Sequence, residues 1–184
     1  MKKQLTIALS LIAMFLVMGC SQPTLIGKWQ AKNADVKNIL GEVLTDESVN
    51  LKSANVDMMV TDKTITMEVV ASVSATSDGV SMDMDVEYSV EYTYEREGDN
   101  VKLHYASHKA NLKDLKFDSA VTAALEAQGI TTELAKTEMQ KMMQESMDKD
   151  ESAKKDDSFI IKSLEANTLT IEDSDGKVDF IRVN

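Results

Sequence analysis

The chain has 184 residues, with 20 Lys and Arg against 31 Asp and Glu, a formal net charge of −11 and a single cysteine. Such a negative charge argues against nucleic acid and anionic lipid head groups as partners, because both would be repelled. One cysteine excludes an intramolecular disulfide framework and a thiolate metal cluster.

Residues 1–20 have the pattern of an export signal that ends at a lipidation site. Lys2 and Lys3 precede an apolar core, Leu5–Met18, which is too short to span a membrane and is closed by Gly19-Cys20. This ending resembles the lipobox of bacterial lipoproteins, in which the cysteine is lipidated and becomes the first mature residue. We therefore expect residues 1–19 to be a signal peptide, Cys20 to carry acyl chains such as palmitate, and residues 20–24 to form a tether.

Removal of residues 1–19 would leave 165 residues, enough for one domain with its own core. Lys2 and Lys3 leave with the signal, so 18 basic residues face 31 acidic ones and the net charge becomes −13. Attachment to the membrane is then expected through the acyl chains on Cys20 rather than through charge. Ser21 resembles the residue that sorts lipoproteins to the outer membrane, so in a Gram-negative host we expect a lipid-anchored protein at the outer membrane, bordering the periplasm.

Alternation of apolar and polar residues dominates the rest of the chain and predicts about eight antiparallel strands. It is clearest over Met82–Glu95, where seven apolar residues share one face, and a strand of that length is expected to bend or bulge. Sequential strands in this number favour a small up-and-down barrel. The other expected strands are Leu25–Gln30, Asn55–Thr61, Lys63–Thr76, Val101–Ala106, Ser158–Leu164, Thr168–Asp173 and Lys177–Val183.

Three segments have helical spacing instead. The first is Val36–Leu44, after a possible N-cap at Asn33. Asp118 is expected to cap a helix over Ser119–Gln128 that ends at Gly129, and Thr131 or Thr132 to begin another that runs to Asp148. We expect the last two helices to form a hairpin within an insertion at 112–150 of a domain over 25–184, followed by a charged connector over Lys149–Asp157.

Several short motifs resemble those of lipocalin-like (calycin) barrels, especially the small bacterial lipoproteins among them. Leu25-Ile26-Gly27-Lys28-Trp29 resembles the Gly-x-Trp opening of that family, and Tyr92-Thr93-Tyr94, Val101-Lys102-Leu103 and Phe159–Leu164 are similar to its later strands. The resemblance implies a mainly β, lipocalin-like antiparallel barrel with inserted helices and no universal catalytic residues. It also implies that a basic residue on the last strand, here Arg182, packs across Trp29 and closes the barrel.

Possible metal and catalytic residues have simpler explanations. His104 and His108 lie roughly 13 Å apart if they share a strand, too far to bind one metal ion, so both are expected on the surface. The acidic row Asp83, Asp85, Glu87 and Glu91 points one way from one strand, which suits a solvated face better than a Ca²⁺ site. Because the chain has no nucleophile motif, phosphate loop or His-Glu-x-x-His, we expect neither an enzyme nor a cofactor or metal.

Methionines form a stripe on the last predicted helix. Met139, Met142, Met143 and Met147 share one side of it. Three interpretations stay open: packing on the sheet, an adaptable groove for a ligand or partner, and Cu(I) binding by thioethers.

Two functions remain from different classes. In the first, the barrel binds a small hydrophobic ligand between its sheet and the inserted helices. The wall would be formed by Met82, Met84, Tyr88, Tyr92 and Tyr94. In the second, the barrel is filled, and the protein is an interaction or inhibitor lipoprotein whose acidic surface meets a basic protein partner.

Overall fold

The computed structural model describes residues 23–33, 36, 49–77, 80–151 and 154–183. Eight antiparallel strands close into a ring, in which each strand pairs with its neighbours in sequence and β8 returns to β1. This confirms the predicted mainly β, up-and-down barrel. The strands are β1 (Gly27–Ala31), β2 (Val49–Val60), β3 (Thr64–Ser77), β4 (Val80–Glu97), β5 (Asn100–Phe117), β6 (Asp157–Leu164), β7 (Thr168–Glu172) and β8 (Lys177–Val183).

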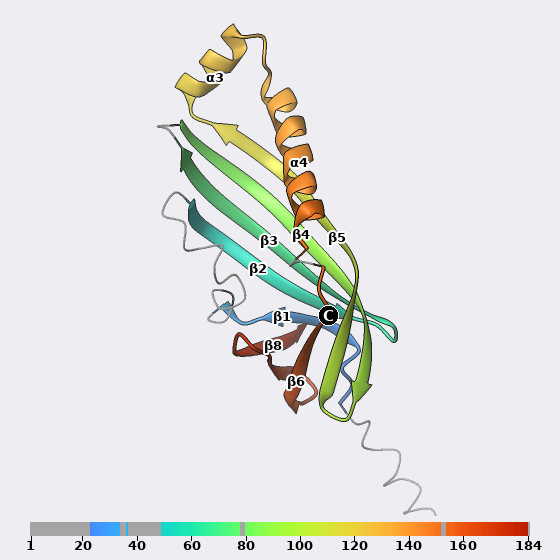
Figure 1. The fold of residues 1–184 in the computed structure, drawn as a ribbon. Helices are drawn as coiled ribbons and strands as arrows, with labels where there is room; N and C mark the ends of the chain where they lie inside the picture. Colours follow the sequence, from blue (N-terminus) through green and yellow to red (C-terminus); the bar gives the residue numbers. More distant parts are fainter. Residues whose placement is uncertain (1–22, 34–35, 37–48, 78–79, 152–153, 184) are drawn as a thin grey trace, which may run out of the picture.

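The strands are unequal in length, so all eight pair into a ring only at one end of the molecule, which we call the closed end. β1 pairs with β2 over Asp57–Val60, and β6 pairs with β5 over Asn100–Leu103. Beyond these pairings β2 to β5 continue together as a four-stranded sheet, which rises above β1, β6 and β8 in Figure 1. We call this extension the wing, and it comprises residues 49–56, 69–77, 80–88 and 110–117.

The core fills the closed end of the ring around Trp29, whose side chain is fully buried. The indole Nε1 donates a hydrogen bond to the Leu25 carbonyl at 2.7 Å. The predicted contact with the last strand is present, because the Arg182 guanidinium carbon lies 4.1 Å from the centroid of the Trp29 ring. Arg182 also donates to the carbonyls of Thr24, Ile26 and Ala166, so it ties the start of the domain to β8.

β5 is longer than predicted, and its register explains why. The alternation predicts an end at Ala106, but the strand continues to Phe117. Two shifts of register interrupt its pairing with β4, where Ala106 and Lys113 are the extra residues on β5. Each bulge moves the following residues by one position, so a strict two-residue period no longer describes the strand. The bulges expected along the long Met82–Glu95 segment are therefore found, with their extra residues on the partner strand.

Two helices lie between β5 and β6, later than the expected start of the insertion at 112. α3 (Ser119–Ala127) begins at the N-cap Asp118, which accepts from Val121 N, and Gly129 follows it with φ +75°. α4 (Thr132–Lys149) begins at the N-cap Thr131. The two helices do not form the expected hairpin, because α4 packs along β5 (Figure 1).

Some predictions concern residues outside the described ranges. They are the signal peptide, lipidation at Cys20 and the first helix, of which only Val36 is described, as a buried member of the core. Among the described residues, no helix is long and apolar enough to cross a membrane.

Candidate ligand site at the mouth of the ring

A cavity of about 370 Å³ lies where the closed ring opens onto the wing, and we call it the mouth cavity. Small-molecule sites commonly measure about 300–1,000 Å³ and combine apolar walls with a few polar groups. Here the polar lining residues, besides two tyrosines, are Asp157, Ser158 and Asp173. The apolar wall comprises Met58, Ile65, Met67, Val69, Val90, Leu103, Phe159 and Ile171, with the rings of Tyr88 and Tyr92.

Tyr88 and Tyr92 are the aromatic part of this wall. Burial raises the pKa of both hydroxyls, and the neighbouring Tyr105 adds to the shift in each. Both side chains therefore stay neutral at physiological pH and can donate or accept a hydrogen bond. Tyr92 also meets Tyr105 edge to face, with ring centroids 6.4 Å apart, which holds its ring in place.

The five expected ligand residues do not all meet at this cavity. Tyr88 and Tyr92 line it, whereas Met82 and Met84 lie farther out on the wing, opposite Phe117 and Leu115. Tyr94 packs against the core at the closed end and donates its hydroxyl hydrogen to the Thr61 carbonyl at 2.9 Å.

The sequence analysis placed the whole wall on one strand, so it missed the wall residues that other strands contribute. The sequence signal for them was the same alternation on β3, where Met67 and Val69 pair with Val90 and Tyr88 of β4. The contributions of Phe159 and Ile171 depend on ring closure, which places β6 and β7 across from β3.

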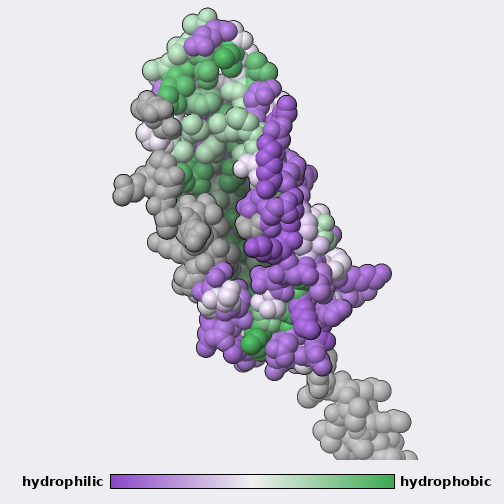
Figure 2. Space-filling view, in the orientation of Figure 1, coloured by the Kyte–Doolittle hydropathy of each residue, from purple (hydrophilic) through white to green (hydrophobic). Residues whose placement is uncertain are grey.

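The inner face of the wing continues the apolar wall away from the cavity. Figure 2 shows hydrophobic surface over the upper part of the sheet, bordered on one side by the hydrophilic α4. From Tyr92 to Met82 this face extends about 33 Å at ~3.3 Å per residue. Successive rows of paired residues make it up: Val56, Val69, Tyr88 and Ala110; Ala54, Ala71, Val86 and Leu112; Leu51, Val73, Met84 and Leu115.

A polar stripe on α4 holds the helix against the outer edge of β5. The stripe consists of Lys136, Gln140, Gln144 and Asp148, spaced four residues apart and so on one side of the helix. Gln140 donates to the Ala110 carbonyl at 2.8 Å and accepts from Leu112 N, while Gln144 accepts from Ala110 N at 3.1 Å. These amides take the place of a neighbouring strand, so this edge of β5 is covered where β6 does not reach it. We call the contact the glutamine clasp.

The two histidines bind acidic residues rather than each other. His104 lies 2.9 Å from Asp156 and is partly exposed. His108 was expected on the surface, but its side chain is only 3% exposed, since it lies on the inner face of β5 under the end of α4. Its Nε2 lies 2.9 Å from Asp148 Oδ1 and its Nδ1 2.8 Å from the Tyr105 hydroxyl. The hydrogen bond from His108 is the main reason that the pKa of Asp148 is lowered.

The methionine stripe of α4 is only partly buried. Met139, Met143 and Met147 are half-buried, and the side chain of Met142 is 59% exposed. No residue of α4 is buried, so polar contacts contribute strongly to its placement. Within the described part of the chain, no cluster of three His, Cys, Asp or Glu side chains could hold a metal ion. Copper binding by the thioethers stays a prediction.

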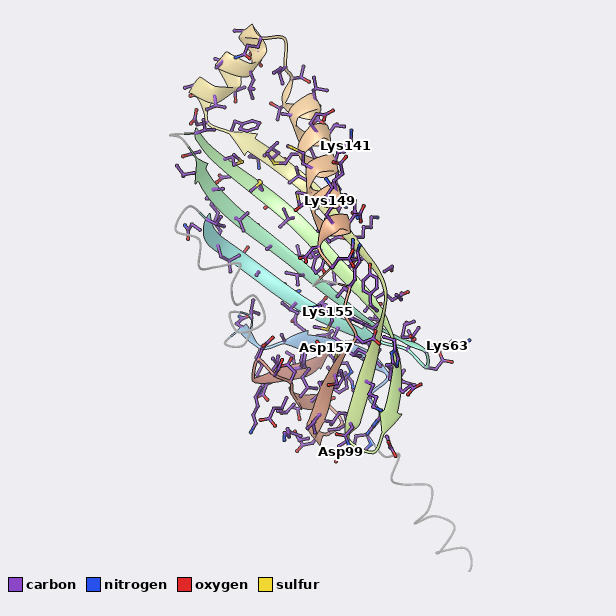
Figure 3. All side chains as sticks on the ribbon, in the orientation of Figure 1. Lys63, Asp99, Lys141, Lys149, Lys155 and Asp157 are labelled. Carbon is purple, nitrogen blue, oxygen red and sulfur yellow. The ribbon has the colours of Figure 1, made fainter. Side chains whose placement is uncertain are left out.

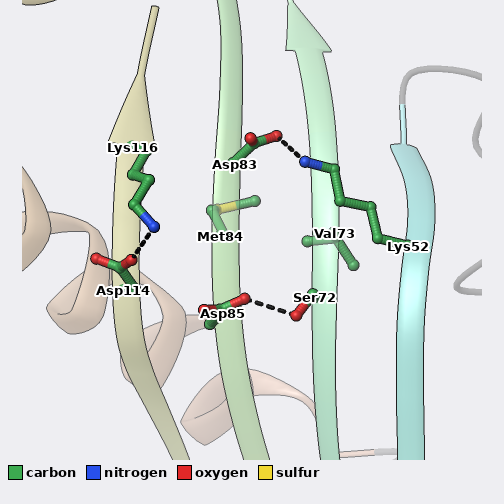
Figure 4. Close-up of a pocket in the computed structure, with 8 residues that line it drawn as sticks. All are labelled: Lys52, Ser72, Val73, Asp83, Met84, Asp85, Asp114 and Lys116. Atoms are coloured by element: carbon green, nitrogen blue, oxygen red, sulfur yellow. Dashed lines mark hydrogen bonds and ion pairs between the residues drawn. The ribbon is translucent and has the colours of Figure 1, made fainter.

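The acidic row of β4 lies on the outer face, beside a hollow of about 170 Å³ (Figure 4). Lys52 contacts Asp83 at 2.6 Å, Ser72 donates to Asp85 at 2.6 Å, and Lys116 contacts Asp114 at 2.7 Å. Lys52 and Lys116 lower the pKa of Asp83 and Asp114 respectively. Because these charges pair locally, the hollow is a surface network and a poorer candidate for a ligand site than the apolar cavity.

Comparison with known proteins adds no relative to this description. No family model matches the chain, and no curated protein is significantly similar to it. The assignment of a function therefore depends on the geometry of the site.

Proposed function

We propose that the chain is a lipid-anchored, lipocalin-like protein of the cell envelope that binds a small hydrophobic ligand in the mouth cavity. The observation that carries this proposal is a cavity of about 370 Å³ with an aromatic and aliphatic wall. The apolar inner face of the wing leads directly from it and provides further contact area for an elongated ligand.

The size and chemistry of the cavity suit an alkyl or acyl chain. Burial of ten methylene groups contributes up to about 8 kcal/mol at ~0.8 kcal/mol each. That amount corresponds to a dissociation constant of roughly 1 μM before the costs of ordering the chain. The alternative, an interaction or inhibitor lipoprotein with a filled barrel, accounts for the packed core around Trp29 but not for the cavity beside it.

Native mass spectrometry of the full-length protein, released from membranes of its own host, tests the proposal. A retained mass of a few hundred daltons that is lost on solvent extraction supports ligand binding. Replacement of Tyr88 by Glu places a charge on the cavity wall and should remove that mass. Thr93→Glu adds the same charge to an exposed position on the same strand and should leave it in place. Protein that carries no adduct and binds no alkyl probe would contradict the proposal.

Anchoring at Cys20 is tested separately by cell fractionation. We expect the wild-type chain in the outer-membrane fraction of a Gram-negative host and the Cys20→Ser variant outside the membranes. If the variant remains with the membranes unchanged, the lipid anchor is wrong, although the cavity could still bind a ligand.

A further inference from the structure

The rim of the mouth cavity carries charge of one sign only. Two carboxylates, Asp157 and Asp173, are among its lining residues, and among the described residues no Lys, Arg or His lines it. The antiparallel pairing of β6 with β7 explains why they lie together, since it brings the start of β6 and the end of β7 to the same edge. An adjoining hollow of about 110 Å³ shares Asp173, Met67 and Ile171 with the cavity and adds Asp175.

Local hydrogen bonds leave these carboxylates able to meet a ligand. Asp157 Oδ1 accepts from the backbone N–H of Ser158 at 2.7 Å. Asp173 Oδ1 accepts from the N–H groups of Asp175 and Gly176 at 2.9 and 3.0 Å, which fixes the turn between β7 and β8. These bonds use one oxygen of each carboxylate.

Lys155, the lysine nearest to Asp157 in the sequence, does not line the cavity. Figure 3 places Lys155 and Asp157 where the connection from α4 enters β6. Asp157 lines the cavity and Lys155 does not. A polar group placed at this rim would therefore meet Asp157, Asp173 and the two tyrosines.

We propose that the mouth cavity selects a chain with a cationic amine or quaternary ammonium head group and rejects free fatty acids. This inference rests on the proposed function and names the class of its ligand. Asp157 and Asp173 would attract the cation, and the faces of Tyr88 and Tyr92 offer additional cation–π contact. An anionic head would meet two carboxylates and, among the described lining residues, no basic partner, and the net charge of the chain repels it further.

Photolabelling of the full chain in lipid nanodiscs tests this selection. Three diazirine probes would share one alkyl chain and differ in the head group: quaternary ammonium, neutral glucoside or carboxylate. Labelling would be quantified on peptides from β3 and β4, so that probe dissolved in the lipid is not counted. We expect the ammonium probe to bind about tenfold more tightly than the carboxylate probe, the size expected for two partly exposed charges, with a smaller ratio at high salt.

Matched variants locate the source of the preference. The double variant Asp157→Asn/Asp173→Asn should bring the probes to nearly equal affinity. Asp62→Asn/Asp99→Asn removes the same charge from exposed turns outside the cavity and should preserve the ratio. Equal wild-type labelling by all probes, a preference for the carboxylate, or an unchanged ratio in the rim variant would overturn the inference and leave the proposed function intact. Failure of every probe to label β3 and β4 would overturn the proposed function itself.

Discussion

At the scale of single residues, the closed end depends on three residues that fit one another: Gly27, Trp29 and Arg182. Arg182 covers the ring of Trp29 and donates to three backbone carbonyls, and this position leaves no space for a side chain at residue 27. The Gly-x-Trp opening therefore has a physical reason in this chain. Gly27 permits the close approach of the Arg182 guanidinium, and Trp29 fills the core at the closed end of the barrel.

Replacement of Trp29 by Ala should destabilise the protein by about 3–5 kcal/mol, because it leaves a large cavity in the core and removes the surface on which Arg182 rests. Urea unfolding followed by far-UV circular dichroism gives the free energy directly. In the wild type, Trp29 is the only tryptophan, so its emission should be blue-shifted and resistant to iodide quenching. A quenchable, red-shifted emission would contradict the buried position.

Gly27→Ala should cost about 1–3 kcal/mol of unfolding free energy. Gly27 has φ +142°, and an added Cβ would lie 2.5 Å from Arg182 Nη1. Gly176→Ala is the matched control, because Gly176 has φ +136° and no atom within 4 Å of the added Cβ. The Gly27 variant should therefore be the less stable of the two in urea. Equal losses would assign the effect to backbone conformation alone.

At the scale of elements, the strands were predictable wherever alternation is regular. β4 keeps an unbroken register with β3, and its seven alternating pairs were found from the sequence. On β5 the inner residues step from Tyr105 to His108 and from Leu112 to Leu115, because a bulge intervenes each time. A two-residue period is lost at each such step, so the sequence pattern predicts too short a strand.

The candidate site was only partly predictable for a related reason. Tyr88 and Tyr92 were found from the face of one strand, but the rim carboxylates come from β6 and the end of β7. Their proximity follows from ring closure, which no local pattern reports. On α4, the sequence analysis singled out the methionine stripe. The contacts that place the helix come instead from the equally regular stripe that contains Gln140 and Gln144.

The glutamine clasp gives a prediction about α4. Gln140→Ala/Gln144→Ala should speed amide hydrogen exchange at Ala110 and Leu112, whose N–H groups bond to these side chains. The loss of stability should be about 1–3 kcal/mol, since buried backbone groups lose their partners. Glu138→Ala shortens an exposed side chain of the same helix and should change neither quantity. Unchanged exchange in the double variant would mean that backbone edge protection has another source.

At the scale of the whole molecule, acidic charge has two opposing effects on stability. A net charge of −11 makes the folded chain repel itself, and salt should relieve this repulsion. Against it, several carboxylates are held by local partners that lower their pKa below the ordinary value. These are Asp83, Asp114, Asp148, Asp156, Glu172 and Asp179.

The pH dependence of folding should follow from these two effects. A carboxylate whose pKa is lower in the folded state stabilises the fold above its unfolded pKa, and this contribution is lost as the pH falls through the folded value. We therefore expect the urea midpoint to change little, or to rise slightly as repulsion weakens, from about pH 7 to 5, and to fall steeply below about pH 4.

Asp148→Asn isolates one part of this acid loss. The amide keeps the size of the side chain but cannot ionise, so the variant should be less stable than wild type at neutral pH. The difference should shrink as the pH falls, because wild-type Asp148 then becomes neutral as well. Asp62→Asn, in the turn between β2 and β3, provides a control with the same change of charge. If the two variants give parallel urea midpoints at every pH, the contact between Asp148 and His108 contributes nothing to the pH dependence of stability.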